Sequence, residues 1–337
     1  MSHHETLKTL RPNEPFELES GLSLLPRIKL NLTIHRADKS VSPIDEWKLK
    51  RSLIDYLEKS QSISIPEEDI KVFKYRDLKK RKREDPVARG SLFVLDLGFL
   101  SKRLLLNGED GVEKAFLEWR KGIVADMDGM ELNLEGVKFK LSVELPNGDD
   151  FEGMRKEWEE IAAFGTRGYQ RIERQQPDTI MLRGVPSRWF AEPRVSSKPS
   201  MLVTHTIFSA FGKIRTLDVG EDNDRGEDED EEDGGDLVSG LHCKIVVQYE
   251  SYKDFYNALK VLCGRSLNKQ GSRLRSDYEV TWDRNGYFRN GRRLTEQTKT
   301  GWTPTTGAGN YRSEASQRRS QASRISPDDA RRKRFKD

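Results

Sequence analysis

The feature that most constrains the fold is a succession of strands and helices that occurs twice along the chain. From residue 28 to 145, and again from 178 to 283, alternating apolar residues predict strands and helically spaced apolar residues predict helices, in the order β-α-β-β-α-β. This order is typical of an α+β fold in which two helices cover one face of a four-stranded antiparallel sheet. The sequence therefore predicts two ferredoxin-like domains, 28–145 and 178–283.

Within the N-terminal repeat, residues 28–145, strands are expected at 30–34, 70–75, 91–95 and 137–145. Ser42-Pro43 predicts the start of the first helix, because serine is a good N-cap and proline suits the first helical turn. Apolar residues from Val112 to Ile123 predict the second helix.

A helical connector is expected between the repeats, at residues 146–177. Phe151, Met154, Trp158 and Ile161 are spaced three, four and three apart, so they lie on one stripe of an amphipathic helix. Such a helix either docks on a neighbouring domain, which we favour, or binds a partner.

The C-terminal repeat, residues 178–283, shows the same order with clearer boundary signals. Strands are expected at 179–185, 214–219, 242–249 and 278–282. Helices are expected at 200–211, closed by Gly212, and from Ser251, as N-cap, to just before Gly264.

Charge is distributed unevenly along this 337-residue chain. Its net charge is +3, yet the segment from residue 284 to 337 holds 14 Lys/Arg and 5 Asp/Glu, which gives +9 and leaves −6 for the rest. An acidic insert, 221–239, interrupts the C-terminal repeat. We expect the insert and the basic tail, 284–337, to be disordered, because neither has apolar periodicity, and we treat residues 1–27 as an N-terminal extension.

The outer face of the C-terminal sheet is the expected binding surface. Strand alternation places five residues there, namely Met181, Arg183, Lys244, Val246 and Gln248. None is aromatic, so the base-stacking that usually carries RNA affinity on such a sheet is missing. Trp189-Phe190 follows the first strand and either packs on the domain edge, which we favour, or contributes to recognition.

Two basic clusters are candidates for nuclear import or for phosphate contacts. The first consists of Lys79, Lys80, Arg81, Lys82 and Arg83, and the second of Arg331, Arg332, Lys333 and Arg334. A solvated run of charge is the alternative for each.

Other function classes find little support in the sequence. The five histidines have no metal-ligand spacing, and no phosphate-binding glycine loop or nucleophile elbow occurs. No apolar run is long enough to span a membrane, and the first residues lack a signal-peptide core. We therefore expect neither an enzyme nor a metal, cofactor, membrane or small-molecule partner, and a cytosolic or nuclear location.

The runs Pro177-Asp178-Thr179-Ile180, Trp189-Phe190 and Phe208-Ser209-Ala210-Phe211-Gly212 resemble the A-kinase anchor protein 17A family. The resemblance implies an RNA-recognition motif, a nuclear-speckle location and a part in pre-mRNA splicing.

These features lead to two functional hypotheses. The first is a non-enzymatic nuclear RNA-binding protein that contacts single-stranded pre-mRNA and spliceosomal proteins through a degenerate RNA-recognition motif and a basic tail. The second is a protein–protein adaptor of the splicing or kinase-signalling machinery. The basic tail favours the first hypothesis, and the sheet without aromatic residues favours the second.

Overall fold

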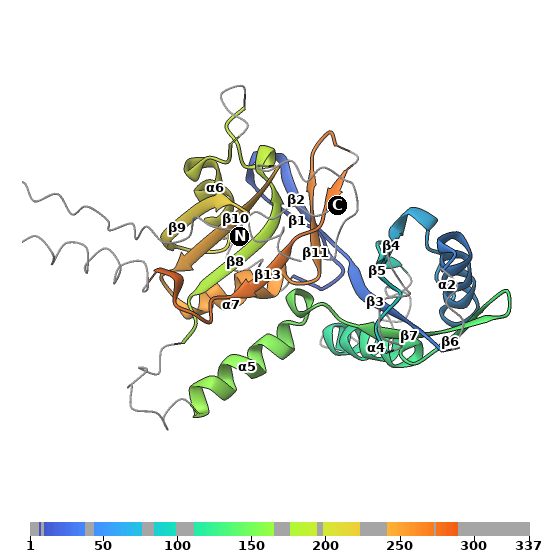
Figure 1. Ribbon diagram of the computed structural model, residues 1–337. Helices are drawn as coiled ribbons and strands as arrows, with labels where there is room; N and C mark the ends of the chain where they lie inside the picture. Colours follow the sequence, from blue (N-terminus) through green and yellow to red (C-terminus); the bar gives the residue numbers. More distant parts are fainter. Residues whose placement is uncertain are drawn as a thin grey trace, which may run out of the picture. The chain divides into compact units, whose positions relative to one another are not determined.

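The computed structural model describes nine stretches of the chain. They are residues 7, 10–37, 44–75, 84–98, 111–164, 176–193, 198–222, 241–272 and 274–288, with only the backbone at 111, 112 and 164. Contacts divide the chain into two compact units, Met1–Asn285 and Gly286–Asp337. The first unit contains all the helices and strands that follow (Figure 1).

The N-terminal repeat forms a five-stranded antiparallel sheet with two helices packed on one face. The sheet order is β4-β5-β3-β7-β6. The elements are β3 (Ile28–Arg36), α2 (Glu46–Gln61), β4 (Ile70–Lys74), β5 (Ala88–Val94), α4 (Gly111–Met127), β6 (Glu131–Leu134) and β7 (Val137–Glu144), with a short 3-10 helix at Glu67–Asp69. Alternate strand residues and the apolar stripes of α2 and α4 share one core, so the sequence order is observed with β6 added at one edge.

The first helix begins later than the sequence predicts. The side chain of Asp45 accepts hydrogen bonds from the backbone N–H groups of Trp47 and Lys48, which makes Asp45 the N-cap. Ile44 is not helical, so the expected start at Ser42-Pro43, which lies outside the described residues, is wrong. Aspartate serves as well as serine in this role, and three residues separate the two candidates.

The C-terminal repeat forms a four-stranded antiparallel sheet in the order β13-β8-β10-β9. Its elements are β8 (Thr179–Pro186), α6 (Met201–Phe208), β9 (Ile214–Glu221), β10 (His242–Tyr249), α7 (Tyr252–Leu262) and β13 (Glu279–Trp282), with a 3-10 helix at Ser187–Trp189. Ser251 caps α7 as predicted, since its hydroxyl accepts from the N–H of Asp254. Gly264 follows α7 with φ +70°, a conformation that favours glycine.

A third sheet connects the N-terminal segment to the C-terminal repeat. Its order is β1-β2-β11-β12, with β1 at Phe16–Glu17, β2 at Leu22–Pro26, β11 at Arg265–Lys269 and β12 at Arg275–Ser276. Leu24 pairs with Leu267 across β2 and β11, and both side chains belong to the core of the C-terminal repeat. Residues 16–26 are therefore part of the folded unit, a pairing that the sequence analysis did not anticipate.

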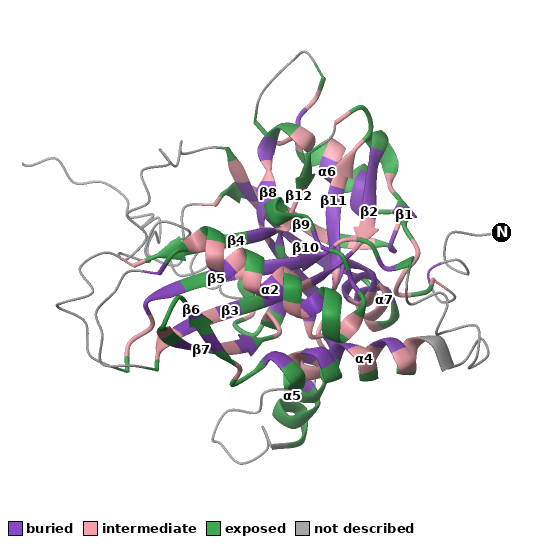
Figure 2. Cartoon of the chain, turned by 90° about the vertical axis from the view of Figure 1, so that its right-hand side faces the viewer, coloured by how far each residue is buried: buried purple, intermediate pink, exposed green. Residues whose placement is uncertain are grey.

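Helix α5 (Phe151–Phe164) follows a 3-10 helix at Asn147–Asp149 and packs on the C-terminal repeat. Figure 2 shows exposed surface along α2 and α5, whereas the strands are largely buried. The described residues form a mixed α+β structure with three antiparallel sheets and five α-helices, which confirms the expected class. None of these helices is long and apolar enough to cross a membrane.

Candidate nucleic-acid interface

The two central strands of the C-terminal sheet, β8 and β10, carry the residues that the sequence singled out. Met181 of β8 lies opposite Thr281 on one side and Val246 on the other, and Val246 lies opposite Asp218 of β9. The alternate residues, including Ile245 and Val247, enter the core with the helices. The row from Thr281 to Asp218 therefore crosses the face away from the helices.

The centre of this outer face is closed to solvent. Val246 is only 1% exposed although it is absent from the core beneath the sheet, and Gln248 is also buried. The Gln248 side-chain amide donates to Asp178 Oδ2 at 2.9 Å, which fixes its position. Met181, Arg183 and Lys244 are half-buried and remain the accessible members of the expected set.

The outer face also has a mixed charge. Arg183 lies opposite Glu279, and Asp218 belongs to the row described above. Among the described residues of this face, the cations Arg183 and Lys244 therefore lie near the acids Asp218 and Glu279, and Arg215 pairs with Asp178 beside Gln248. Such a face attracts a polyanion weakly, because the carboxylates repel phosphate.

Trp189 and Phe190 lie at the edge of the domain. Phe190 is buried and stacks on Phe208 of α6, with ring centroids 6.2 Å apart and planes 18° apart. Trp189 is half-buried against the same core. The pair therefore packs on the domain, which is the alternative that the sequence favoured, and neither ring is brought to the outer sheet face.

Both basic clusters, 79–83 and 331–334, lie outside the described residues, as does most of the acidic insert. Of the insert, the structure describes Glu221, which is the last residue of β9, and Asp222. There the Gly184 N–H donates to Asp222 Oδ2 at 2.8 Å, which ties the end of β9 to β8.

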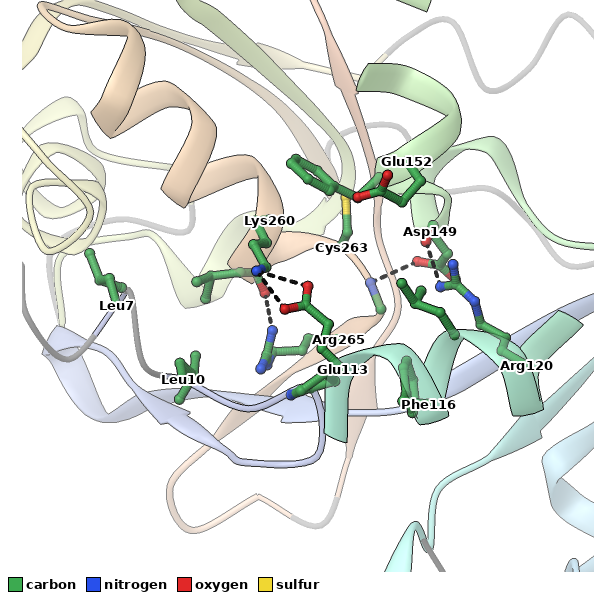
Figure 3. A pocket seen from close by; sticks show the side chains of 15 residues that line it. Leu7, Leu10, Glu113, Phe116, Arg120, Asp149, Glu152, Lys260, Cys263 and Arg265 are labelled. Atoms are coloured by element: carbon green, nitrogen blue, oxygen red, sulfur yellow. Dashed lines mark hydrogen bonds and ion pairs between the residues drawn. The ribbon is translucent and has the colours of Figure 1, made fainter. Parts of the chain in front are cut away.

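A pocket lies between α4 and the α7–β11 region (Figure 3). Glu113 of α4 pairs with Lys260 of α7 at 2.8 Å, and Arg120 donates to the backbone carbonyl of Asp149 at 3.0 Å. Burial lowers the pKa of Arg120, and Asp150 and Asp149 oppose this shift. Because Glu113, Lys260 and Arg120 already contact groups of the same chain, we assign the pocket a structural role.

Cys263 lines this pocket and Cys243 lies within β10, and both thiols are buried. Burial raises the pKa of Cys243 to about 12 and that of Cys263 well above its usual value. Among the described residues, no group of His, Cys, Asp and Glu side chains could hold a metal ion.

We expect both cysteines to resist iodoacetamide in the native protein. At pH about 8, a thiol with a pKa of about 12 is ionised in roughly one molecule in ten thousand, and the thiolate is the nucleophile. Mass spectrometry after alkylation should find no modification in buffer and two modified cysteines in denaturant. Rapid modification of Cys243 in the native state would contradict this prediction.

The sequence analysis missed an aromatic side chain on the other large sheet. Phe93 of β5 is absent from the core beneath the five-stranded sheet, to which its neighbours Leu92 and Val94 belong, so its ring lies on the outer face. The run Arg89-Gly90-Ser91-Leu92-Phe93-Val94 resembles the third-strand signature of RNA-recognition motifs at Arg, Gly, Phe and Val. That motif was the signal that could have revealed this face.

The comparisons with known proteins agree with the family resemblance found in the sequence. A family model described as "AKAP-17A-like, RNA-binding domain" matches residues 112–321, which is more than half of the chain. The chain is also similar to A-kinase anchor protein 17A of Homo sapiens, with 27% identity over 169 residues. This alignment covers 48% of the chain and 24% of the human protein, so the chain spans about a quarter of that relative.

Proposed function

Because the chain belongs to the AKAP-17A-like RNA-binding-domain family, we propose that it is a nuclear RNA-binding protein that takes part in pre-mRNA splicing. Its ligand in this proposal is single-stranded RNA, and its protein partners belong to the spliceosome. The two basic clusters, 79–83 and 331–334, act as nuclear-import or phosphate-contact segments, and nuclear speckles are the expected location.

The observation that carries this proposal is the order of strands in the C-terminal repeat. The first and third strands, β8 and β10, lie in the middle of an antiparallel sheet, and α6 and α7 share one core on one of its faces. This is the arrangement of an RNA-recognition motif, in which the other face meets RNA. We infer that both repeats are ferredoxin-like domains and that the C-terminal repeat is an RNA-recognition motif.

Electrostatic contacts supply most of the RNA affinity of the C-terminal repeat in this proposal. Its outer face offers Arg183 and Lys244 without a stacking ring, and the sequence adds 14 Lys/Arg after residue 283. Contacts of this kind bind the phosphate backbone and weaken as salt increases. Sequence preference then depends on Arg183 and Lys244, which lie where bases would rest.

An adaptor function is the second candidate, and the buried centre of the C-terminal sheet favours it. Val246 is inaccessible, and acidic side chains, Asp218 and Glu279, lie among the basic ones on that face. The exposed Met201 and Leu202 at the start of α6 give the domain an apolar surface elsewhere. If the protein is an adaptor, these surfaces bind protein partners of the splicing or kinase-signalling machinery.

Replacing the tail residues Arg331, Arg332, Lys333 and Arg334 with Ala should weaken binding to all single-stranded RNAs alike. Each lost phosphate contact lowers the dependence of log affinity on log salt by about 0.7, so the slope should fall by up to about 3. Titration of labelled RNA at several salt concentrations measures both effects.

The matched comparison is a variant with Arg183 and Lys244 replaced by Ala. It should lose less affinity than the tail variant and should change sequence preference more. If the tail variant binds like the wild type and the sheet variant does not bind, the tail-dominated mechanism is wrong. If the wild type fails to bind RNA at low salt, the adaptor function replaces the proposal.

A further inference from the structure

The outer face of the five-stranded sheet differs from that of the C-terminal sheet in its charge. Strand alternation and the membership of the core place the following charged residues on it: Lys29, Lys71, Arg89, Lys138 and Lys140, with Glu131 and Glu144. Among the described strand residues, five cations therefore lie beside two acids, and two acids from outside the sheet reach the face: Asp277 pairs with Lys29 at 2.6 Å, and Asp128 accepts from the Ser142 hydroxyl. On this face, which we call the N-terminal sheet face, the cations Lys71, Arg89 and Lys138 are exposed to solvent.

The N-terminal sheet face also presents an accessible aromatic ring. Phe73 of β4 is 46% exposed and lies opposite Arg89 of β5, and the register continues to Thr33 of β3. The Arg89 guanidinium lies over the ring of Tyr75, 5.4 Å from its centroid. An exposed ring beside a guanidinium is the pairing that stacks a base and holds its phosphate.

Basic side chains cover a second ring at one end of the face. Lys29, Lys71 and Arg27 lie 5.6 to 5.9 Å from the centroid of Phe93. Phe93 is buried beneath them, so it supports the cations and is not itself open for stacking. The face therefore combines one accessible ring, Phe73, with cations that Phe93 positions.

Glycine at position 90 keeps the two aromatic strands close together. A Cβ atom at Gly90 would lie 2.6 Å from the backbone carbonyl oxygen of Lys71, inside van der Waals contact. Only glycine lets β4 and β5 pair at this point, which sets Phe73 opposite Arg89. Gly90 and Arg89 both belong to the run that resembles the third-strand signature, and together they place a guanidinium opposite Phe73.

We propose that the N-terminal sheet face binds single-stranded RNA, as a second site besides the C-terminal repeat. Phe73 stacks on a base, Arg89 and Lys71 contact phosphate, and Asn31, Thr33 and Ser91 offer hydrogen bonds to base edges or ribose hydroxyls. These residues precede the family match, which begins at residue 112. The inference goes beyond the proposed function, which places RNA on the C-terminal repeat and the tail.

Charge decides between RNA and a protein as the ligand of this face. A surface with the exposed cations Lys71 and Arg89 beside one exposed ring, Phe73, matches a polyanion that carries stacked bases. A protein-binding patch of this size would be expected to expose several adjacent apolar residues. Polar side chains separate Phe73 from the other strands, because Thr33 and Ser91 occupy the neighbouring outward positions.

The test is anisotropy titration of the full chain with a labelled oligouridine of about 16 nucleotides. Phe73→Ala should weaken binding about 5- to 150-fold, since removing a stacking ring loses that much affinity. Phe73→Tyr keeps a ring and should bind within about twofold of the wild type. Ultraviolet crosslinking should attach RNA to the peptide that contains residues 71–75.

Trp47 of α2 provides the matched control. Its side chain is 52% exposed, and its ring centroid lies 4.9 Å from the Arg51 guanidinium carbon, but it belongs to a helix and not to the sheet face. Trp47→Ala should bind like the wild type. If Phe73→Ala also binds like the wild type, the proposal is overturned and a protein remains as the class of ligand. The proposal is also overturned if Phe73→Ala and Trp47→Ala lose affinity equally, because an equal loss would indicate a non-specific effect.

The double variant Arg183→Ala, Lys244→Ala separates this inference from the proposed function. If it loses binding while Phe73→Ala does not, the C-terminal repeat binds RNA and the N-terminal sheet face does not. If Phe73→Ala loses binding while the double variant changes neither affinity nor sequence preference, this inference stands and the C-terminal sheet site is wrong. A wild-type chain that binds no RNA at low salt overturns both.

Discussion

Replacing Arg27 with Ala should lower the free energy of unfolding by about 3–5 kcal/mol, which is a large loss for one substitution. The Arg27 side chain is 1% exposed and lies between β2 and β3. Its removal takes the ion-pair partner from the buried Asp149, whereas Asp277 keeps Lys29 at 2.6 Å. An uncompensated buried charge is among the most destabilising defects.

Arg27 joins three parts of the chain. Its guanidinium contacts Asp149 Oδ2 at 2.5 Å and also pairs with Asp277, which precedes β13. Its Nε donates to Ser266 Oγ at 2.8 Å, and Asp149 Oδ1 accepts from the Gly264 N–H. Burial alone would lower the pKa of Arg27, but the coulombic attraction of Asp149 and Asp277 more than offsets it, so the pKa is raised.

Denaturant unfolding of the single and double variants tests this cluster. Asp149→Ala should also be strongly destabilising, and the double variant Arg27→Ala, Asp149→Ala should lose less than the sum of the two. The control is Lys114→Ala, which removes a solvent-exposed pair with Glu118 and should change stability by less than about 1 kcal/mol. Additive losses at Arg27 and Asp149 would contradict the idea of a coupled buried cluster.

The local pattern of the chain was predictable because strand alternation and helix caps are encoded in neighbouring residues. The inward positions of β10, such as Ile245 and Val247, follow from a period of two. The Ser251 cap and Gly264 follow from the chemistry of helix ends.

Long-range pairing was not predictable in the same way. The third sheet joins Leu24 to Leu267, and the buried cluster joins Arg27 to Asp149 and Asp277. In the sequence, Arg27 is one basic residue after a proline, and nothing local distinguishes it from a solvated arginine. The same limit applies to Val246, since alternation gives the face of a side chain and not whether that face is covered.

The second large effect is expected at Trp158, the central residue of the apolar stripe of α5. Its side chain is 4% exposed and meets three rings edge-on, those of Phe151, Phe255 and Trp282, with centroids 5.6 to 6.1 Å apart. Phe255 belongs to α7 and Trp282 to β13, so α5 completes the core of the C-terminal repeat.

Trp158→Ala should therefore lower the free energy of unfolding by about 3–5 kcal/mol, through lost burial and the cavity that remains. Trp158→Phe keeps a ring against the same neighbours and should be milder. Ile161 is the matched control on the same helix and the same stripe, because it is 48% exposed, and Ile161→Ala should change stability by less than about 1 kcal/mol.

Urea unfolding followed by circular dichroism measures all three variants, and the dependence on urea concentration shows whether the cooperative unit changes. A large loss at Trp158 with an unchanged slope indicates that α5 unfolds together with the C-terminal repeat. This would agree with the family match, which begins at residue 112 and includes α5 in the same domain. If Trp158→Ala instead costs as little as Ile161→Ala, α5 is a connector without a packing role, and its stripe is available to a partner.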